Sequence, residues 1–73
     1  MATVELKSEV TGSVWQIKKQ PGEAVAEGDI VMIMESMKME IPVVAEDAGT
    51  LETILVKEGE SVAEGQTVAI LET

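Results

Sequence analysis

The sequence predicts an all-β sandwich or barrel, and three observations lead to this fold class. Aliphatic residues carry the hydrophobic content, with 10 Val, 6 Ile and 4 Leu against a single aromatic residue, Trp15. This excess of β-branched side chains favours strands over helices. Turn signals recur every eight to ten residues, which is typical of sandwiches and barrels. The chain also repeats itself, so two similar halves are expected to fold as two copies of one unit.

The repeat is clear when residues 12–36 are laid over residues 49–73, an offset of 37, because 11 of the 25 positions are identical. All six glycines fall into three of these pairs: Gly12/Gly49, Gly22/Gly59 and Gly28/Gly65. Extended to the whole chain, the halves are residues 1–36 and 37–73, with no linker or tail left over. We therefore expect a single domain over residues 1–73, either free-standing or cut from a larger protein.

Each half is expected to hold short strands between turns. In the first half, strands are predicted at residues 3–7, 12–18 and 30–35, with a brief strand at 24–26. In the second half, they are predicted at residues 40–45, 49–56 and 67–72, with a brief strand at 61–63. Glycines at matching positions mark the turns between them. No segment has a convincing helical period.

Two details of the strands also follow from the residues. Residues 30–34 are apolar on both phases, so alternation alone does not say which side faces the core. The identical pairs Val31/Val68 and Ile33/Ile70 favour an inward position for these residues. Pro42 lies inside a predicted strand and indicates an edge position, because it cannot donate to a β-ladder.

A lysine stands where the two halves join. The strands at 30–35 and 40–45 are separated by four residues, 36–39, a length that suits a hairpin turn. Lys38 would lie at the exposed tip of this hairpin. By the symmetry of the repeat, the equivalent place in the other half is where the chain ends meet. The termini should therefore lie at the opposite end of the domain from Lys38.

Charge and composition exclude several classes of partner. The net charge is −9, from 14 acidic residues and five lysines. Nucleic-acid binding needs a cationic face for phosphates, and anionic membrane surfaces also attract basic segments, so neither partner is expected. The first residues lack the basic n-region and the apolar run of a signal peptide, so none is expected, and no stretch is long enough to span a bilayer. We expect a cytoplasmic protein that is monomeric as an isolated domain.

Catalytic and metal-binding constellations are absent from the sequence. There is no His and no Cys, so the commonest nucleophile–base pairs cannot be built and a transition-metal site is not expected. The carboxylates are spread over turns, without a pair placed for acid–base work. The chain is therefore not expected to be an enzyme by itself.

Residues 35–40, Glu-Ser-Met-Lys-Met-Glu, resemble the attachment motif of the biotinyl/lipoyl carrier family. Biotin carriers have a motif similar to Ala-Met-Lys-Met, and Ser36 stands here in place of the alanine. The twofold repeat and its matched turns extend the resemblance over the whole chain, which looks most like the small free-standing biotin carboxyl carrier (biotin/lipoyl attachment) proteins. Residues 9–12, Glu-Val-Thr-Gly, depart from the Ala-Pro-Met-Pro-Gly stretch of large carboxylase domains, so the carboxylase it serves stays open.

The resemblance implies a flattened barrel or sandwich of two four-stranded antiparallel sheets. It implies that a biotin protein ligase attaches biotin to Lys38, and that the biotin carries carboxyl groups from a biotin carboxylase to a carboxyltransferase of an acyl-CoA carboxylase. The protein would then be a carrier and a ligase substrate, with the cofactor supplying the chemistry. The residues expected to be recognised by the ligase or by partner enzymes surround this lysine: Glu35, Ser36, Met37, Met39 and Glu40.

Two alternatives stay open at this point. The first is a lipoyl carrier of an acyl-transfer complex, although lipoyl domains more often have an acidic residue before the lysine, as in Asp-Lys-Ala. Met-Lys-Met therefore favours biotin over lipoate. The second is an unmodified barrel that serves only as an interaction domain, in which Lys38 is one more solubilising charge.

Overall fold

A computed structural model describes residues 2–73, which form eight strands and no helix. The strands are β1 (Thr3–Lys7), β2 (Gly12–Ile17), β3 (Ala24–Val25), β4 (Ile30–Ser36), β5 (Met39–Val44), β6 (Gly49–Ile54), β7 (Ser61–Val62) and β8 (Thr67–Glu72). Every predicted strand is present, with ends that differ by two residues at most. In this part of the chain no helix could cross a membrane.

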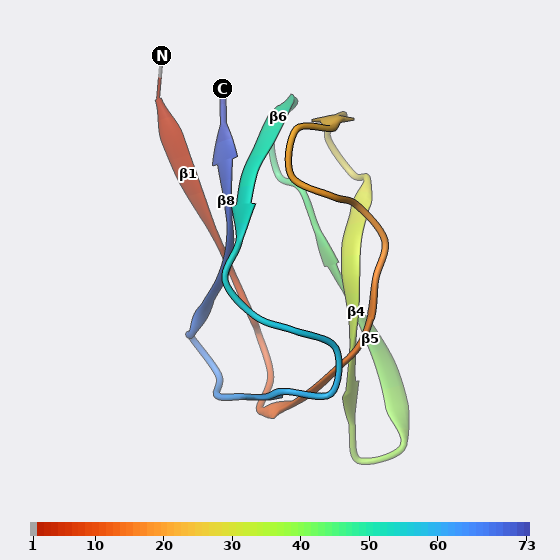
Figure 1. Cartoon of the computed structure of the whole chain (residues 1–73). Coiled ribbons are helices and arrows are strands. Elements are labelled where there is room, and N and C mark those ends of the chain that lie inside the picture. The colour runs from red at the N-terminus through yellow and green to blue at the C-terminus, as the bar shows by residue number, and fades with distance from the viewer. Residues whose placement is uncertain (1) are drawn as a thin grey trace.

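The strands form two four-stranded antiparallel sheets that pack face to face, which confirms the predicted fold class (Figure 1). One sheet has the order β1-β8-β6-β3 and is called here the terminal sheet, because it holds the first and last strands. The other has the order β5-β4-β2-β7 and is called the hairpin sheet. Pro42 lies on the edge strand β5, as predicted. The domain measures 36 × 17 × 17 Å, so it is an elongated sandwich.

The strand register reproduces the sequence repeat residue by residue. Val4 pairs with Leu71 in the terminal sheet, and their counterparts Ile41 and Met34 pair in the hairpin sheet. Both sheets also carry a β-bulge at the same place in the repeat. One lies between Val14 and Gln16 and the other between Leu51 and Thr53. The two halves are therefore two copies of one unit, down to the irregularities of the backbone.

The core lies between the sheets and is aliphatic. It consists of Leu6, Val14, Val25, Val31, Met32, Met34, Val43, Ala45, Leu51, Val56, Val62, Val68, Ala69 and Leu71. Trp15, the residue inside the β2 bulge, is 43% exposed and lies outside the core. A domain of this size therefore depends on close packing of small branched side chains and two methionines.

The predicted inward positions were half right. Val31 and Val68 are fully buried, but Ile33 and Ile70 are only half-buried, and Met34 and its counterpart Leu71 face the core instead. The cause in β4 is a register shift between Ile30 and Met32, where two consecutive residues, Val31 and Met32, are both buried. A bulge of this kind changes the phase of the strand alternation, and sequence periodicity cannot locate it.

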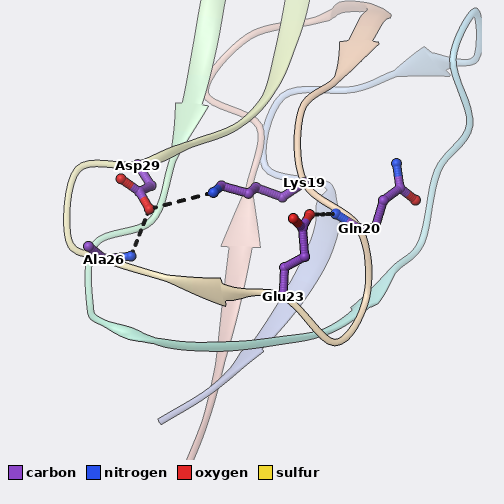
Figure 2. Close-up of polar contacts among 5 residues, drawn as sticks. All are labelled: Lys19, Gln20, Glu23, Ala26 and Asp29. Atoms are coloured by element: carbon purple, nitrogen blue, oxygen red, sulfur yellow. Dashed lines mark hydrogen bonds and ion pairs between the residues drawn. The ribbon is translucent and has the colours of Figure 1, made fainter.

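Four turns of the domain share one construction, and two of them are drawn in Figure 2. In the first, the Glu23 N–H donates to the Gln20 carbonyl while a Glu23 carboxylate oxygen accepts the Gln20 N–H at 2.5 Å. Asp29 makes the same pair of bonds with Ala26, and Lys19 lies 3.9 Å from the Asp29 carboxylate. The third position of each turn is a glycine with φ between 84° and 94°, as type II turns require. Lys57–Glu60 and Ala63–Gln66 repeat the arrangement in the second half.

The two ends of the long domain have different roles. The β4–β5 hairpin forms one end, and the chain termini lie together at the other (Figure 1). Ala2 and Thr73 exchange backbone hydrogen bonds of 3.3 and 2.8 Å at the terminal end. The prediction that the termini lie opposite the hairpin is confirmed for Ala2 and Thr73. Met1, the repeat counterpart of Lys38, lies outside the described residues.

Candidate functional site

The β4–β5 hairpin has a tighter turn than predicted. Ser36 and Met39 pair with each other, so the connection consists of two residues, Met37 and Lys38, and not four. Both have positive φ, 52° and 65°. A two-residue turn with φ > 0 at both positions is type I′, whose twist matches that of the flanking strands. The β4–β5 pairing therefore extends to Ser36 and Met39, directly beside the turn. The hydrophobic pattern of the sequence could not predict this extension.

This turn is strained by its own sequence. Type I′ turns are usually formed by Asn-Gly or similar pairs, because a side chain in the left-handed region costs about 1–2 kcal/mol per residue. Here a methionine and a lysine occupy the two positions. Strained backbone of this kind persists where the surrounding structure holds it in place, and it concentrates at functional sites.

Replacing Met37 by asparagine tests this strain. Asparagine tolerates the left-handed region, so Met37→Asn is expected to raise the free energy of unfolding by up to about 1 kcal/mol. Chemical denaturation of the wild-type and variant domains measures the change. Met39→Asn is the matched control, since Met39 lies in a strand and should gain nothing. Equal effects of the two substitutions would mean that Met37 is not strained.

The tip of the hairpin is open to solvent. Met37 is 91% exposed, Met39 is 62% exposed, and Lys38 between them is also exposed. Among residues 2–73, no hydrogen bond or ion pair engages the Nζ of Lys38. Exposure by itself does not single out this lysine, because Lys7 and Lys57 are exposed as well. What distinguishes Lys38 is its place on a strained turn between two exposed thioethers.

The base of the hairpin is fixed to the body of the domain. The Ser36 hydroxyl donates to the Thr11 carbonyl at 2.8 Å, and the Thr11 hydroxyl accepts the Glu64 N–H at 3.0 Å. Gly12 packs so closely on the backbone of Glu35 that a Cβ there would overlap with the Glu35 carbonyl oxygen. The predictions included Ser36 but missed Thr11 and Gly12. The Gly12/Gly49 identity was the available signal, since Gly49 packs in the same way on Glu72.

Glu35 and Glu40 are brought together by the strand pairing. They lie directly opposite each other on β4 and β5, and both are exposed. Like charges opposite each other repel and weaken a hairpin. Within residues 2–73 the ion-pair geometry is met only by Lys19 and Asp29, so neither glutamate is neutralised in this way. The strand pairing thus places Glu35 and Glu40 on the two strands that lead to the Lys38 turn, and leaves two carboxylates available to an external cation.

The arrangement is suited to covalent attachment at one amine. The described residues contain no cluster of three or more His, Cys, Asp or Glu side chains that could hold a metal ion. Lys38 is exposed on a turn that the Ser36–Thr11 hydrogen bond holds at its base, so its Nζ is accessible to a reacting group. The hairpin therefore presents one exposed lysine on a two-residue turn that is joined to the body of an all-β domain.

Comparison with known proteins assigns this domain to a family. A family model described as "Biotin-requiring enzyme" matches residues 2–71, and the chain belongs to this biotin/lipoyl attachment family. It is 36% identical over 50 residues to a "Biotinylated protein TB7.3 homolog" of Mycobacterium leprae, a match that covers 68% of this chain and 70% of that protein. It is 38% identical over 46 residues to a "Biotin/lipoyl attachment protein" of Bacillus subtilis, covering 63% of each.

Larger proteins contain a similar segment. The chain is 37% identical over 49 residues to the human mitochondrial propionyl-CoA carboxylase alpha chain, covering 67% of this chain but 7% of that one. Its structure is similar to a segment of Kluyveromyces lactis urea carboxylase, with a TM-score of 0.94 and 38% identity over 99% of this chain. That segment is only 6% of the urea carboxylase chain.

Two further solved structures are similar to this fold. A single-chain, multi-domain long-chain acyl-CoA carboxylase matches with a TM-score of 0.86 and 25% identity, covering 93% of this chain and 7% of that one. The lipoyl domain of the 2-oxoglutarate dehydrogenase complex from Azotobacter vinelandii matches with a TM-score of 0.74 and 31% identity, covering 88% and 81%. The same fold therefore occurs in segments of two carboxylases and in a lipoyl domain.

Proposed function

We propose that this protein is a biotin carboxyl carrier in which Lys38 is the residue acylated by a biotin protein ligase. The observation that carries the proposal is the exposed Met37-Lys38-Met39 tip on a strained two-residue turn, in a chain of the biotin-requiring family. Acylation would form an amide bond between the lysine Nζ and the carboxyl carbon of biotin. ATP is cleaved to AMP and pyrophosphate, AMP leaves with the carboxylate oxygen, and the amine loses a proton. The Nζ has no competing partner among residues 2–73.

The residues around Lys38 have separate tasks in this proposal. Ser36 and Gly12 fix the base of the hairpin, so the amine is presented in a defined direction. Met37 and Met39 offer flexible apolar contacts that fit more than one enzyme pocket. Glu35 and Glu40 offer charge to basic groups on the partner. When bound, biotin supplies the ring nitrogen that carries the carboxyl group.

The long shape of the domain serves the carrier role. The β4–β5 hairpin, with Lys38 in its turn, forms one end of the domain and the chain ends lie at the other, so a tether there would not obstruct the access of the loaded lysine to an active site. Tethering of this kind raises the effective concentration of the carried group at each active site. We propose a biotin carboxylase and a carboxyltransferase of an acyl-CoA carboxylase as the two partners. The similarity to a propionyl-CoA and a long-chain acyl-CoA carboxylase supports this choice.

A lipoyl carrier is the second candidate, supported by the structural similarity to a lipoyl domain. The two methionines beside Lys38 and the biotinylated relatives favour biotin. The choice is testable with two ligases. Under the proposal, biotin protein ligase modifies the domain much faster than lipoate ligase does.

The deciding experiment is intact mass spectrometry after incubation with a biotin protein ligase, biotin and ATP. One biotin adduct is expected on the wild type and none on Lys38→Arg, because the arginine keeps the charge but cannot be acylated by the ligase. Lys57→Arg is the matched control, since Lys57 is also exposed and begins the Lys57–Glu60 turn. An adduct on Lys38→Arg, or its absence on a folded wild type, would exclude the proposal.

A further inference from the structure

The outer face of the hairpin sheet is apolar next to the Lys38 hairpin. Strand alternation turns Met34 and Ile41 toward the core, so their neighbours in β4 and β5 face outward. On this face Ile33 pairs with Pro42, and Ile30 pairs with Val44. The bulge residue Trp15 of the adjacent strand β2 is also exposed. We call these residues the hairpin-sheet patch: Trp15, Ile30, Ile33, Pro42 and Val44.

The repeat provides an internal control for this patch. The terminal sheet has the same strands, register and bulges, so the same five positions exist there on an outer face. Their occupants, in the same order, are Glu52, Thr67, Ile70, Glu5 and Lys7.

Four of these five counterparts are polar. Thr67 pairs with Lys7 where Ile30 pairs with Val44, and the Thr67 hydroxyl donates to the Glu5 carboxylate at 2.8 Å. The fold therefore accepts polar side chains at these positions. The apolar character of the hairpin-sheet patch is therefore not a requirement of the sandwich, and apolar side chains exposed on one face are typical of interaction sites. Gln16, which pairs with Ile33 from β2, is a polar neighbour of the patch.

Charge and position indicate which partner fits the patch. Glu35 and Glu40 border it on the side of the turn, and Met37, Lys38 and Met39 follow beyond them. The complementary surface is therefore apolar and edged by lysine or arginine. An enzyme that acylates Lys38 must hold the Nζ in a fixed orientation, because bond formation requires a near-attack geometry. Once the long arm is attached, the carried group lies far from the hairpin and no longer needs such alignment.

We propose that the hairpin-sheet patch is the docking surface for the enzyme that acylates Lys38. This inference rests on the proposed function and adds the surface that orients the hairpin in that enzyme. The patch lies on the same sheet as the hairpin and continues into it, so contacts there fix the direction of the lysine. The terminal sheet has polar residues at four of the five equivalent positions, and under this proposal the acylating enzyme does not bind it.

Matched substitutions in the two halves test this assignment. The test variant is Trp15→Gln/Ile33→Gln, and its control is Glu52→Gln/Ile70→Gln at the counterpart positions. Ile33 and Ile70 are the same residue at equivalent positions and both are half-buried, so the loss of stability should be similar. Initial rates of biotin incorporation by a biotin protein ligase give kcat/KM for each. We expect a fall of at least about tenfold for the test variant and less than about twofold for the control.

Each outcome bears on the proposal. Equal rates for the two variants would overturn it while leaving Lys38 as the biotin site. A folded wild type that is not biotinylated would overturn both. If the test variant is biotinylated normally but the loaded form is carboxylated slowly by a biotin carboxylase, the patch serves a different enzyme and the assignment fails. If the double variant does not fold, Trp15→Glu replaces it, since glutamate already occupies the counterpart bulge at Glu52.

Discussion

Gly12→Ala is expected to destabilise the domain by about 1–3 kcal/mol and to slow the modification of Lys38. The added Cβ would overlap with the Glu35 carbonyl oxygen, so β2 and β4 must move apart at the base of the hairpin. The backbone oxygen cannot rotate away as a flexible side chain could. For a chain of 73 residues this is a large share of the roughly 0.05–0.15 kcal/mol per residue that stabilises native domains.

Gly49→Ala separates stability from function in this experiment. Gly49 packs on the Glu72 carbonyl oxygen in the same way, but at the terminal end of the domain. The two variants should lose similar stability in urea denaturation. Only Gly12→Ala should also slow biotin incorporation, measured at a temperature where both are folded. If both are modified at the wild-type rate, the base of the hairpin does not position the lysine.

Met34→Ala is expected to destabilise the domain by about 2–5 kcal/mol. Met34 is fully buried in the centre of β4, between Val14 and Ile41 on the neighbouring strands. Truncation removes apolar contacts from a core that contains no aromatic side chain to fill the space. The cavity left by the truncation would lie between the two sheets. The hydrogen-bonded strands on either side would limit how far the structure can close around it. Thermal unfolding should show a strongly lowered midpoint.

Met37→Ala is the matched control for Met34→Ala, because it makes the same chemical change at a 91% exposed position. Its effect on stability should stay within about 0.5 kcal/mol, as for most surface substitutions. Met34→Leu should recover most of the loss, since it restores the apolar volume. A small effect of Met34→Ala would show that the sandwich closes around the missing side chain.

The repeat made much of this fold predictable from one sequence. An offset of 37 located matching strands and placed Lys38 opposite the chain ends, and the register in both sheets follows that offset. Glycines fixed the turns, because a positive φ at position three of each turn excludes most other residues. The pairing of β3 with β6 and of β7 with β2 was not predictable, since strands of two residues carry no alternation.

Other features depend on three-dimensional packing and left no sequence signal. Ile33 and Met34 are equally apolar, and only the bulge beside Val31 decides which of them faces the core. Ser8 is buried because its hydroxyl is satisfied locally, donating to the Val10 carbonyl at 2.6 Å. Its repeat counterpart is the buried Ala45, so the fold needs a small residue there and not a polar one. At the site, the motif predicted the residues around Lys38 but not the support that Thr11 gives to Ser36.

The hydrogen bonds between Ala2 and Thr73 have a consequence for protein architecture. Chain ends that are paired this way lie about one strand spacing apart, roughly 4.8 Å. A host protein could therefore accept the whole domain inside a surface loop, since the loop would hardly have to widen. Such an insertion would leave the far end unobstructed. The same unit is thus compatible with an independent existence and with a place inside a much longer polypeptide, without any change in how Lys38 is displayed.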